Sequence, residues 1–115
     1  MRDQAPHNPW AGEVSLVLDG TPRVAKLTLG ALAELEASLG TGTLVELVQR
    51  FEGGQFSTRD VLALIVAGLR GGGWRGTTAD LLSAEIGGGP VVAARVAAAL
   101  LARAFAVPGD ADGAV

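Results

Sequence analysis

The sequence predicts an α+β fold in which an N-terminal β-hairpin is followed by a bundle of four to five short helices. Val14, Leu16 and Leu18 alternate with the residues between them, which is the period-two pattern of a strand with one buried side. Asp19-Gly20 follows as a strong turn dipeptide. Further along, polar residues three positions before an acidic group mark repeated helix starts, and glycines mark the stops.

The hairpin is expected to pair residues 14–18 with a second strand over about residues 23–27. Thr21-Pro22 lengthens the predicted loop beyond the two residues of a minimal turn. Pro22 has no N–H to donate to the ladder, so it is placed at the beginning of the second strand. A two-stranded ribbon is marginal alone, so we expect it to pack on the helices or to pair across a dimer.

The first helix is expected over residues 29–39. Thr28 can cap its N-terminus, and leucines at spacings of three and four give it one apolar face. Gly40 then occupies the position after the last turn, where a left-handed residue commonly ends a helix.

The second helix begins with the spacing of a capping box between Thr43 and Glu46 and ends at Gly53-Gly54. Glu46 and Arg50 are four residues apart, so we expect them to support each other on the exposed side of this helix. The third helix begins at Ser57 in the same way. It is apolar on much of its circumference, and this predicts a central position in the bundle.

The fourth helix is predicted to start at Thr77 and to be short, carrying leucines 81 and 82 together with Ile86. Glycines 87–89 end it, and Pro90 suits the first turn of a fifth helix that runs to about residue 106. We therefore expect a single domain over residues 10–107. A flexible segment over residues 1–9 precedes it, and a disordered tail over residues 108–115 follows.

Composition excludes several classes of function. A net charge of −3 and a pI near 5.0 give no general attraction to phosphate, which counts against a nucleic-acid partner. The chain has no cysteine, which removes thiolate metal sites and fits a cytoplasmic protein. The most apolar run, residues 91–107, carries Arg95 and Arg103 and is shorter than the roughly 20 residues that span a bilayer, so we expect no membrane contact.

Catalysis is not expected either. The one histidine, His7, lies in the flexible N-terminal segment, and most carboxylates have simpler places at helix starts, in the turn or in the tail. Residues 71–76 formally match the G-x-G-x-x-G pattern of dinucleotide sites, but they follow a helix and not a strand. We interpret them as a helix connector and expect no cofactor and no metal.

The remaining candidates are residues for binding a partner protein: Trp74, Arg75, Arg95, Arg103 and Phe105. Trp and Arg are enriched at binding hot spots, although for Trp74 a lid folded over the helical core is the favoured interpretation. Arg95 and Arg103 share one face of the last helix beside an alanine-rich surface that a partner helix can approach. Arginines that cover a packed helix with their aliphatic stems explain the same pattern. Trp10 is open to the same two interpretations, with packing on the hairpin as the simpler one.

Several segments together resemble the small tail protein encoded in gene transfer agent clusters: Trp10-Ala-Gly-Glu13, the strand at 14–18, Lys26-Leu-Thr-Leu29, the Ser57 helix start and the Gly68 to Gly73 stop. That family is similar to the tail assembly chaperones of long-tailed phages and is also labelled a tail tube protein. The resemblance extends over about residues 9–107.

The resemblance implies a non-catalytic tail assembly chaperone in a bacterial cytoplasm. Such a protein binds the tape measure protein, helps recruit tail tube subunits and is absent from the finished particle. A structural tail or tube subunit is the alternative that the second label implies. Whether copies of this chain associate with one another stays open.

Overall fold

The structure, a computed structural model, describes residues 12–40 and 42–105. Its elements in chain order are two strands, β1 (Glu13–Leu18) and β2 (Thr21–Lys26), and five helices, α1 (Leu29–Ser38), α2 (Leu44–Glu52), α3 (Thr58–Gly71), α4 (Thr78–Leu82) and α5 (Gly89–Ala104). The predicted α+β fold is confirmed. The expectations for residues 1–9, Trp10 and residues 108–115 lie outside the described residues.

The hairpin turn is tighter than the sequence suggested. β1 and β2 are antiparallel with Leu18 opposite Thr21, so the loop consists of Asp19-Gly20 alone. Both turn residues have positive φ, 51° and 79°, as the favoured two-residue turns require. The expectation of a longer loop was wrong because Thr21 and Pro22 already belong to β2. Pro22 is opposite Val17, at a position where the missing N–H would point away from β1.

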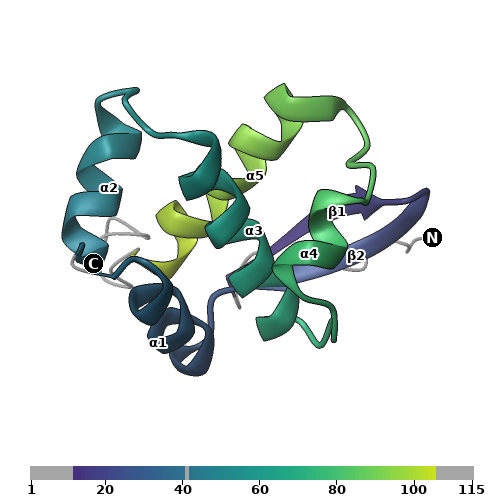
Figure 1. Ribbon diagram of the computed structural model, residues 1–115, viewed down its shortest axis with the longest axis horizontal. Helices are drawn as coiled ribbons and strands as arrows, with labels where there is room; N and C mark the ends of the chain where they lie inside the picture. Colours follow the sequence, from purple (N-terminus) through teal and green to yellow (C-terminus); the bar gives the residue numbers. More distant parts are fainter. Residues whose placement is uncertain (1–11, 41, 106–115) are drawn as a thin grey trace, which may run out of the picture.

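The hairpin packs on the helices, which was one of the two arrangements expected for it. Val14, Leu16 and Leu18 of β1 and Ala25 of β2 are buried on the same side of the ribbon. This side meets α3 and α5. α3 lies at the centre of the molecule in front of α5, with the hairpin toward one side and α1 and α2 toward the other (Figure 1). Burial of the apolar side therefore fixes the ribbon, because a free hairpin would leave it in water.

Three predicted helix starts have the expected capping geometry. In each, a hydroxyl accepts the N–H of the third helical residue, whose carboxylate accepts the N–H of the capping residue. The pairs are Thr43 with Glu46, Ser57 with Asp60, and Thr77 with Asp80. Thr28 caps α1 more simply by accepting the N–H of Ala31 at 3.0 Å.

Two further details of the sequence interpretation were wrong. α4 ends at Leu82, and Ile86 forms an isolated bridge with Leu18 of β1 instead of extending the helix. The cause is Asp19. Its backbone N–H donates to Glu85 O and its carboxylate accepts the N–H of Glu85, both at 2.8 Å, and these bonds hold residues 85–87 against β1. The other error concerns Arg50, whose guanidinium binds Asp60 of α3 and not Glu46.

α3 is the central helix, as predicted. It contacts β2, α1, α4 and α5, and Leu64, Ile65 and Leu69 are completely buried. Its C-terminal end approaches β2 so closely that a Cβ at Gly71 or Gly72 would overlap the carbonyl oxygens of Lys26 and Val24. Of the three glycines that formally matched a dinucleotide pattern, Gly71 thus serves helix–strand packing, while Gly76 leaves room for the ring of Trp74. None of the helices in the described ranges is long and apolar enough to cross a bilayer.

Candidate interaction surface

Trp74 lies in the loop after α3 and packs against the core. Its backbone N–H donates to Leu69 O at 2.9 Å, and its ring occupies the space that a Cβ at Gly76 would need. The side chain remains half-exposed. This is the position that the lid interpretation expects, with part of the ring still accessible to a partner.

Arg75 follows Trp74 and is exposed. Both residues border a depression of about 480 Å³ between the start of α1, the end of α3 and the loop. None of the residues that line this depression belongs to α5. The structure therefore divides the five predicted partner-binding residues into two groups, with Trp74 and Arg75 in one and the three residues of the last helix in the other.

One side of α5 is buried and the opposite side is exposed to solvent. The buried side meets α3 and the hairpin through Ala93, Val96, Ala97, Leu100 and Leu101. On the opposite side, Val91 is 64% exposed and Phe105, at the end of the helix, 46%. Between them Arg95, Ala98 and Ala102 are also exposed. We call these five residues the α5 outer face.

The chemistry of the α5 outer face differs from that of an ordinary solvent-facing helix side. Its members recur at spacings of four, three, four and three, which is the spacing of a helix–helix seam. α5 contains no acidic residue, and neither Arg95 nor the neighbouring Arg103 has an ion pair among the described residues. This face combines accessible apolar groups with unpaired positive charge.

Two apolar grooves also lie on the surface, and neither was predicted from the sequence. The first, the α4 groove, has a volume of about 510 Å³ and lies between α3, α4 and the start of α5. Leu82, 65% exposed, lines it together with Val61, Ile86 and Ala93, and Glu85 is its one charged lining residue. Leu82, in a short predicted helix, was the one feature of the sequence that could have indicated this groove. Sequence alone does not show that Leu82 lies beside α5.

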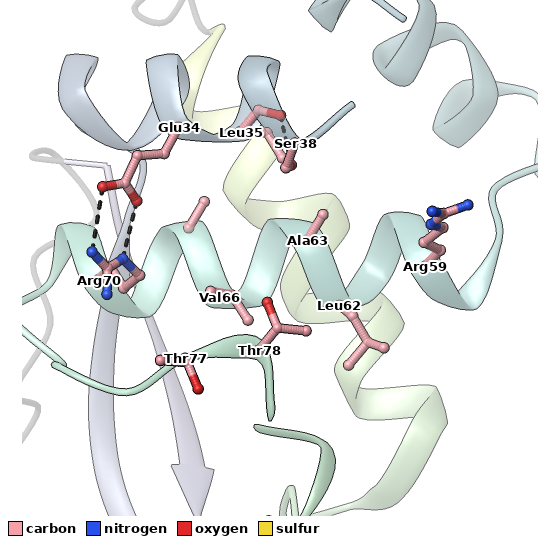
Figure 2. Close-up of a pocket in the computed structure, with 11 residues that line it drawn as sticks. Glu34, Leu35, Ser38, Arg59, Leu62, Ala63, Val66, Arg70, Thr77 and Thr78 are labelled. Carbon is pink, nitrogen blue, oxygen red and sulfur yellow. Dashed lines mark hydrogen bonds and ion pairs between the residues drawn. The ribbon is translucent and has the colours of Figure 1, made fainter. Parts of the chain in front are cut away.

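The second groove, the α3 groove, has a volume of about 430 Å³ and runs along α3. Figure 2 shows Leu62, Ala63 and Val66 of α3 in the middle of it, with α1 along one side and Thr77 and Thr78 along the other. The three aliphatic side chains are half-buried. Arg70 lies toward one end and Arg59 at the other (Figure 2).

Arg70 joins the two sides of the α3 groove. Its Nε donates to Glu34 of α1 at 3.0 Å, a second guanidinium nitrogen reaches the other carboxylate oxygen at 3.4 Å, and the third donates to Gly76 O at 3.1 Å. The hydrogen bonds from Arg70, and then its charge, hold the pKa of Glu34 below its usual value, and the carboxylate raises the pKa of Arg70.

A second ion pair fixes α2 to α3. Arg50 donates from two nitrogens to the two oxygens of Asp60, each at 2.9 Å. Asp60 is buried, and the hydrogen bond from Arg50, aided by those from Ser57, lowers the pKa of its carboxyl against the opposing effect of burial. Within residues 12–40 and 42–105, no three His, Cys, Asp or Glu side chains are grouped to hold a metal ion.

Comparison with known proteins agrees with the resemblance noted in the sequence. The family described as "Phage tail tube protein, GTA-gp10" matches the chain over residues 11–107. No curated protein and no solved structure matches the chain. Tail tube proteins are structural proteins and are not generally enzymes. Because the match extends over nearly all of the sequence, the chain belongs to the GTA-gp10 family of phage tail tube proteins.

Proposed function

We propose that the protein is a tail assembly chaperone that binds the tape measure protein and helps recruit tail tube subunits. The observation that carries this proposal is the α5 outer face. Val91 and Phe105 expose apolar surface at its two ends, and Arg95 has no ion pair among the described residues. A helix side of this kind is expected to be covered during function, because water favours charged and polar groups on exposed helix sides.

Arg95, Arg103 and Phe105 are the residues that we assign to the tape measure contact. The guanidinium groups can donate to carboxylates of a partner, and the exposed alanines allow a helix to approach closely. Trp74 and Arg75 border a different depression, so we assign them to a second contact, with a tail tube subunit. Both contacts would form in the cytoplasm of the host while the particle is assembled, from a cluster carried as a prophage-like element.

A structural tube subunit is the second candidate, and the family description itself supports it. Closing a ring through β-sheet requires strands that continue from one subunit to the next. The sheet in the described part of the chain has two strands, β1 and β2. This small sheet favours the chaperone, while the family label favours the tube.

The two candidates differ in where the protein is found after assembly. Quantitative mass spectrometry of producing-cell lysate and of purified particles, with the tube and tape measure proteins as internal standards, measures this directly. We expect the chain to be abundant in lysate and absent from particles. A copy number in particles equal to that of the tube subunit would instead identify a structural component.

The site assignment has its own experiment. The triple variant Arg95→Ala, Arg103→Ala, Phe105→Ala is expected to lose co-purification with the tape measure protein while its circular dichroism spectrum stays unchanged. Arg23→Ala removes an exposed arginine from β2 and is the matched control, which should still co-purify. An unaffected complex would remove the assignment to α5 and leave the chaperone proposal to the mass spectrometry.

A further inference from the structure

We propose that the α3 groove is a docking site for an amphipathic helix of another protein, and that this helix carries carboxylates at the end that lies beside Arg59. The site is separate from the α5 outer face, since no α5 residue lines it. It therefore goes beyond the tape measure contact proposed above and does not depend on that contact.

The groove has the form that a helix requires. Val66 lies about one turn after Leu62 and Ala63 along α3, and the three leave aliphatic surface half-exposed between α1 and Thr77-Thr78 (Figure 2). An amphipathic helix binds such a surface by inserting side chains spaced three and four residues apart. The partner is thus expected to present leucine-sized side chains at this spacing.

The groove is held open before any partner binds. Arg70 is bonded to Glu34 of α1 and to Gly76 O in the segment that leads to α4, so one side chain fixes both walls. Thr77 is engaged with Asp80 through the capping box of α4. Because these donors and acceptors are already used, the walls offer few polar groups to a ligand, and a partner gains affinity mainly from the apolar floor.

Charge selects the partner. At one end, the charge of Arg70 is balanced by Glu34. At the other end, Arg59 is exposed and has no ion pair among the described residues. The neighbouring Asp60 is already bound to Arg50. The groove therefore presents one uncompensated guanidinium at one end, which a carboxylate satisfies and an ammonium opposes.

The described helices of a second copy of the chain do not supply the occupant. Over the described residues, the exposed large apolar side chains are Val17, Leu29, Val45, Leu82, Val91 and Phe105. No two of them are three, four or seven residues apart on one helix. The α5 outer face does expose apolar groups, but α5 contains no acidic residue, and its exposed Arg95 would oppose Arg59. The groove fits a helix of a different protein.

Two stapled helical peptides of about 15 residues, long enough to span α3, provide the probes. Both carry leucines spaced three and four apart, and they differ only in bearing glutamates or lysines at one end. The measurement is a titration of the isotope-labelled full-length protein followed by NMR. We expect the glutamate peptide to shift the amide signals of Arg59, Leu62, Ala63 and Val66 and to bind more tightly than the lysine peptide.

Arg59→Glu should reverse the preference of the groove. A glutamate at the second position of α3 suits the helix dipole, so the fold is expected to tolerate it. The glutamate peptide should lose affinity about tenfold, since a charge-assisted hydrogen bond is replaced by repulsion, and the lysine peptide should gain. Arg23→Glu makes the same charge change on β2 and should alter neither affinity. Val66→Ala should weaken both peptides by removing part of the floor.

The proposal is overturned if the wild-type protein binds neither peptide, or binds both equally. It is also overturned if the shifted signals fall on α5 and not on α3, or if Arg23→Glu has the same effect as Arg59→Glu. If Arg59→Glu reverses the preference between the two peptides and Arg23→Glu does not, the result supports the docking site, its location on α3 and the sign of its charge.

Discussion

The two ends of α3 are fixed in different ways. At the C-terminal end, Gly71 and Gly72 bring helix backbone against the outward carbonyls of β2, in space that no side chain can share. At the N-terminal end, Asp60 accepts hydrogen bonds from Ser57 and from Arg50 of α2. The first attachment depends on shape, while the second depends on charge and therefore on pH.

This difference shows why one helix can organise the whole molecule. The C-terminal attachment joins α3 to the hairpin through backbone atoms, so no side-chain entropy is lost when it forms. The N-terminal attachment joins it to α2 through long side chains, and α2 itself has only Leu47 among its buried residues. The hairpin end is thus the more rigid one, and the following changes test this contrast.

The largest effect is expected for Gly71→Ala. The added methyl group would overlap Lys26 O, and because that atom belongs to a paired strand, backbone must move. We expect a loss of about 3 kcal/mol in the free energy of unfolding, measured with urea. Gly30→Ala is the control in α1, where the nearest atom to the new Cβ is 3.9 Å away, and it should gain about 0.5–1 kcal/mol. Equal effects of the two substitutions would contradict the close packing.

An intermediate effect is expected for Asp60→Asn, which keeps the shape but removes the charge that Arg50 and Ser57 bind. We expect a loss of about 2 kcal/mol near neutral pH. The pKa of Asp60 is lowered in the folded state, so its contribution is present above the unfolded value of about 3.9 and is lost as pH falls through the folded value. Unfolding curves of both proteins should therefore converge below about pH 4. A constant difference down to the lowest pH would contradict the assignment.

The smallest effect is expected for Glu34→Gln, although the ion pair with Arg70 has good geometry. Glu34 is exposed, and exposed pairs contribute little because water and salt screen them. We expect the melting temperature to change slightly in low salt and not at all in high salt. A large, salt-independent loss would show that Arg70 holds the groove walls mainly through Glu34 and not through Gly76.

The sequence predicted the order of elements and most of their ends because these depend on local chemistry. The hydroxyl–carboxylate pairs starting at Thr43, Ser57 and Thr77 each satisfy the free N–H groups of their own helix. Gly40, with φ of 69°, follows α1 for an equally local reason. Such signals require no knowledge of the rest of the fold.

Apart from the length of the hairpin loop, the errors and omissions involve contacts between separate segments. Arg50 binds Asp60, ten residues away, and not Glu46 on its own helix. The buried carboxylate of Asp60 accepts hydrogen bonds from the guanidinium group through both of its oxygens. Ile86 lies outside α4 because the backbone N–H of the preceding Glu85 donates to Asp19, which is distant in the sequence. Neither groove was foreseen, since each requires side chains from three separate segments to be placed together.

The covered sides of the hairpin have a consequence for assembly. Strands with open edges invite pairing with other chains, which leads to aggregation or to continuous sheets. Here Gly71 and Gly72 lie against the outward carbonyls of β2, and residues 85–87 bond to β1 near the turn, where Gly87 N donates to Val17 O at 2.9 Å. A strand from a neighbouring chain would have to displace these segments to extend the ribbon along its length. The end of β1 beside the turn, and the outer side of β2 at Val24 and Lys26, are therefore closed to pairing with a strand of another chain.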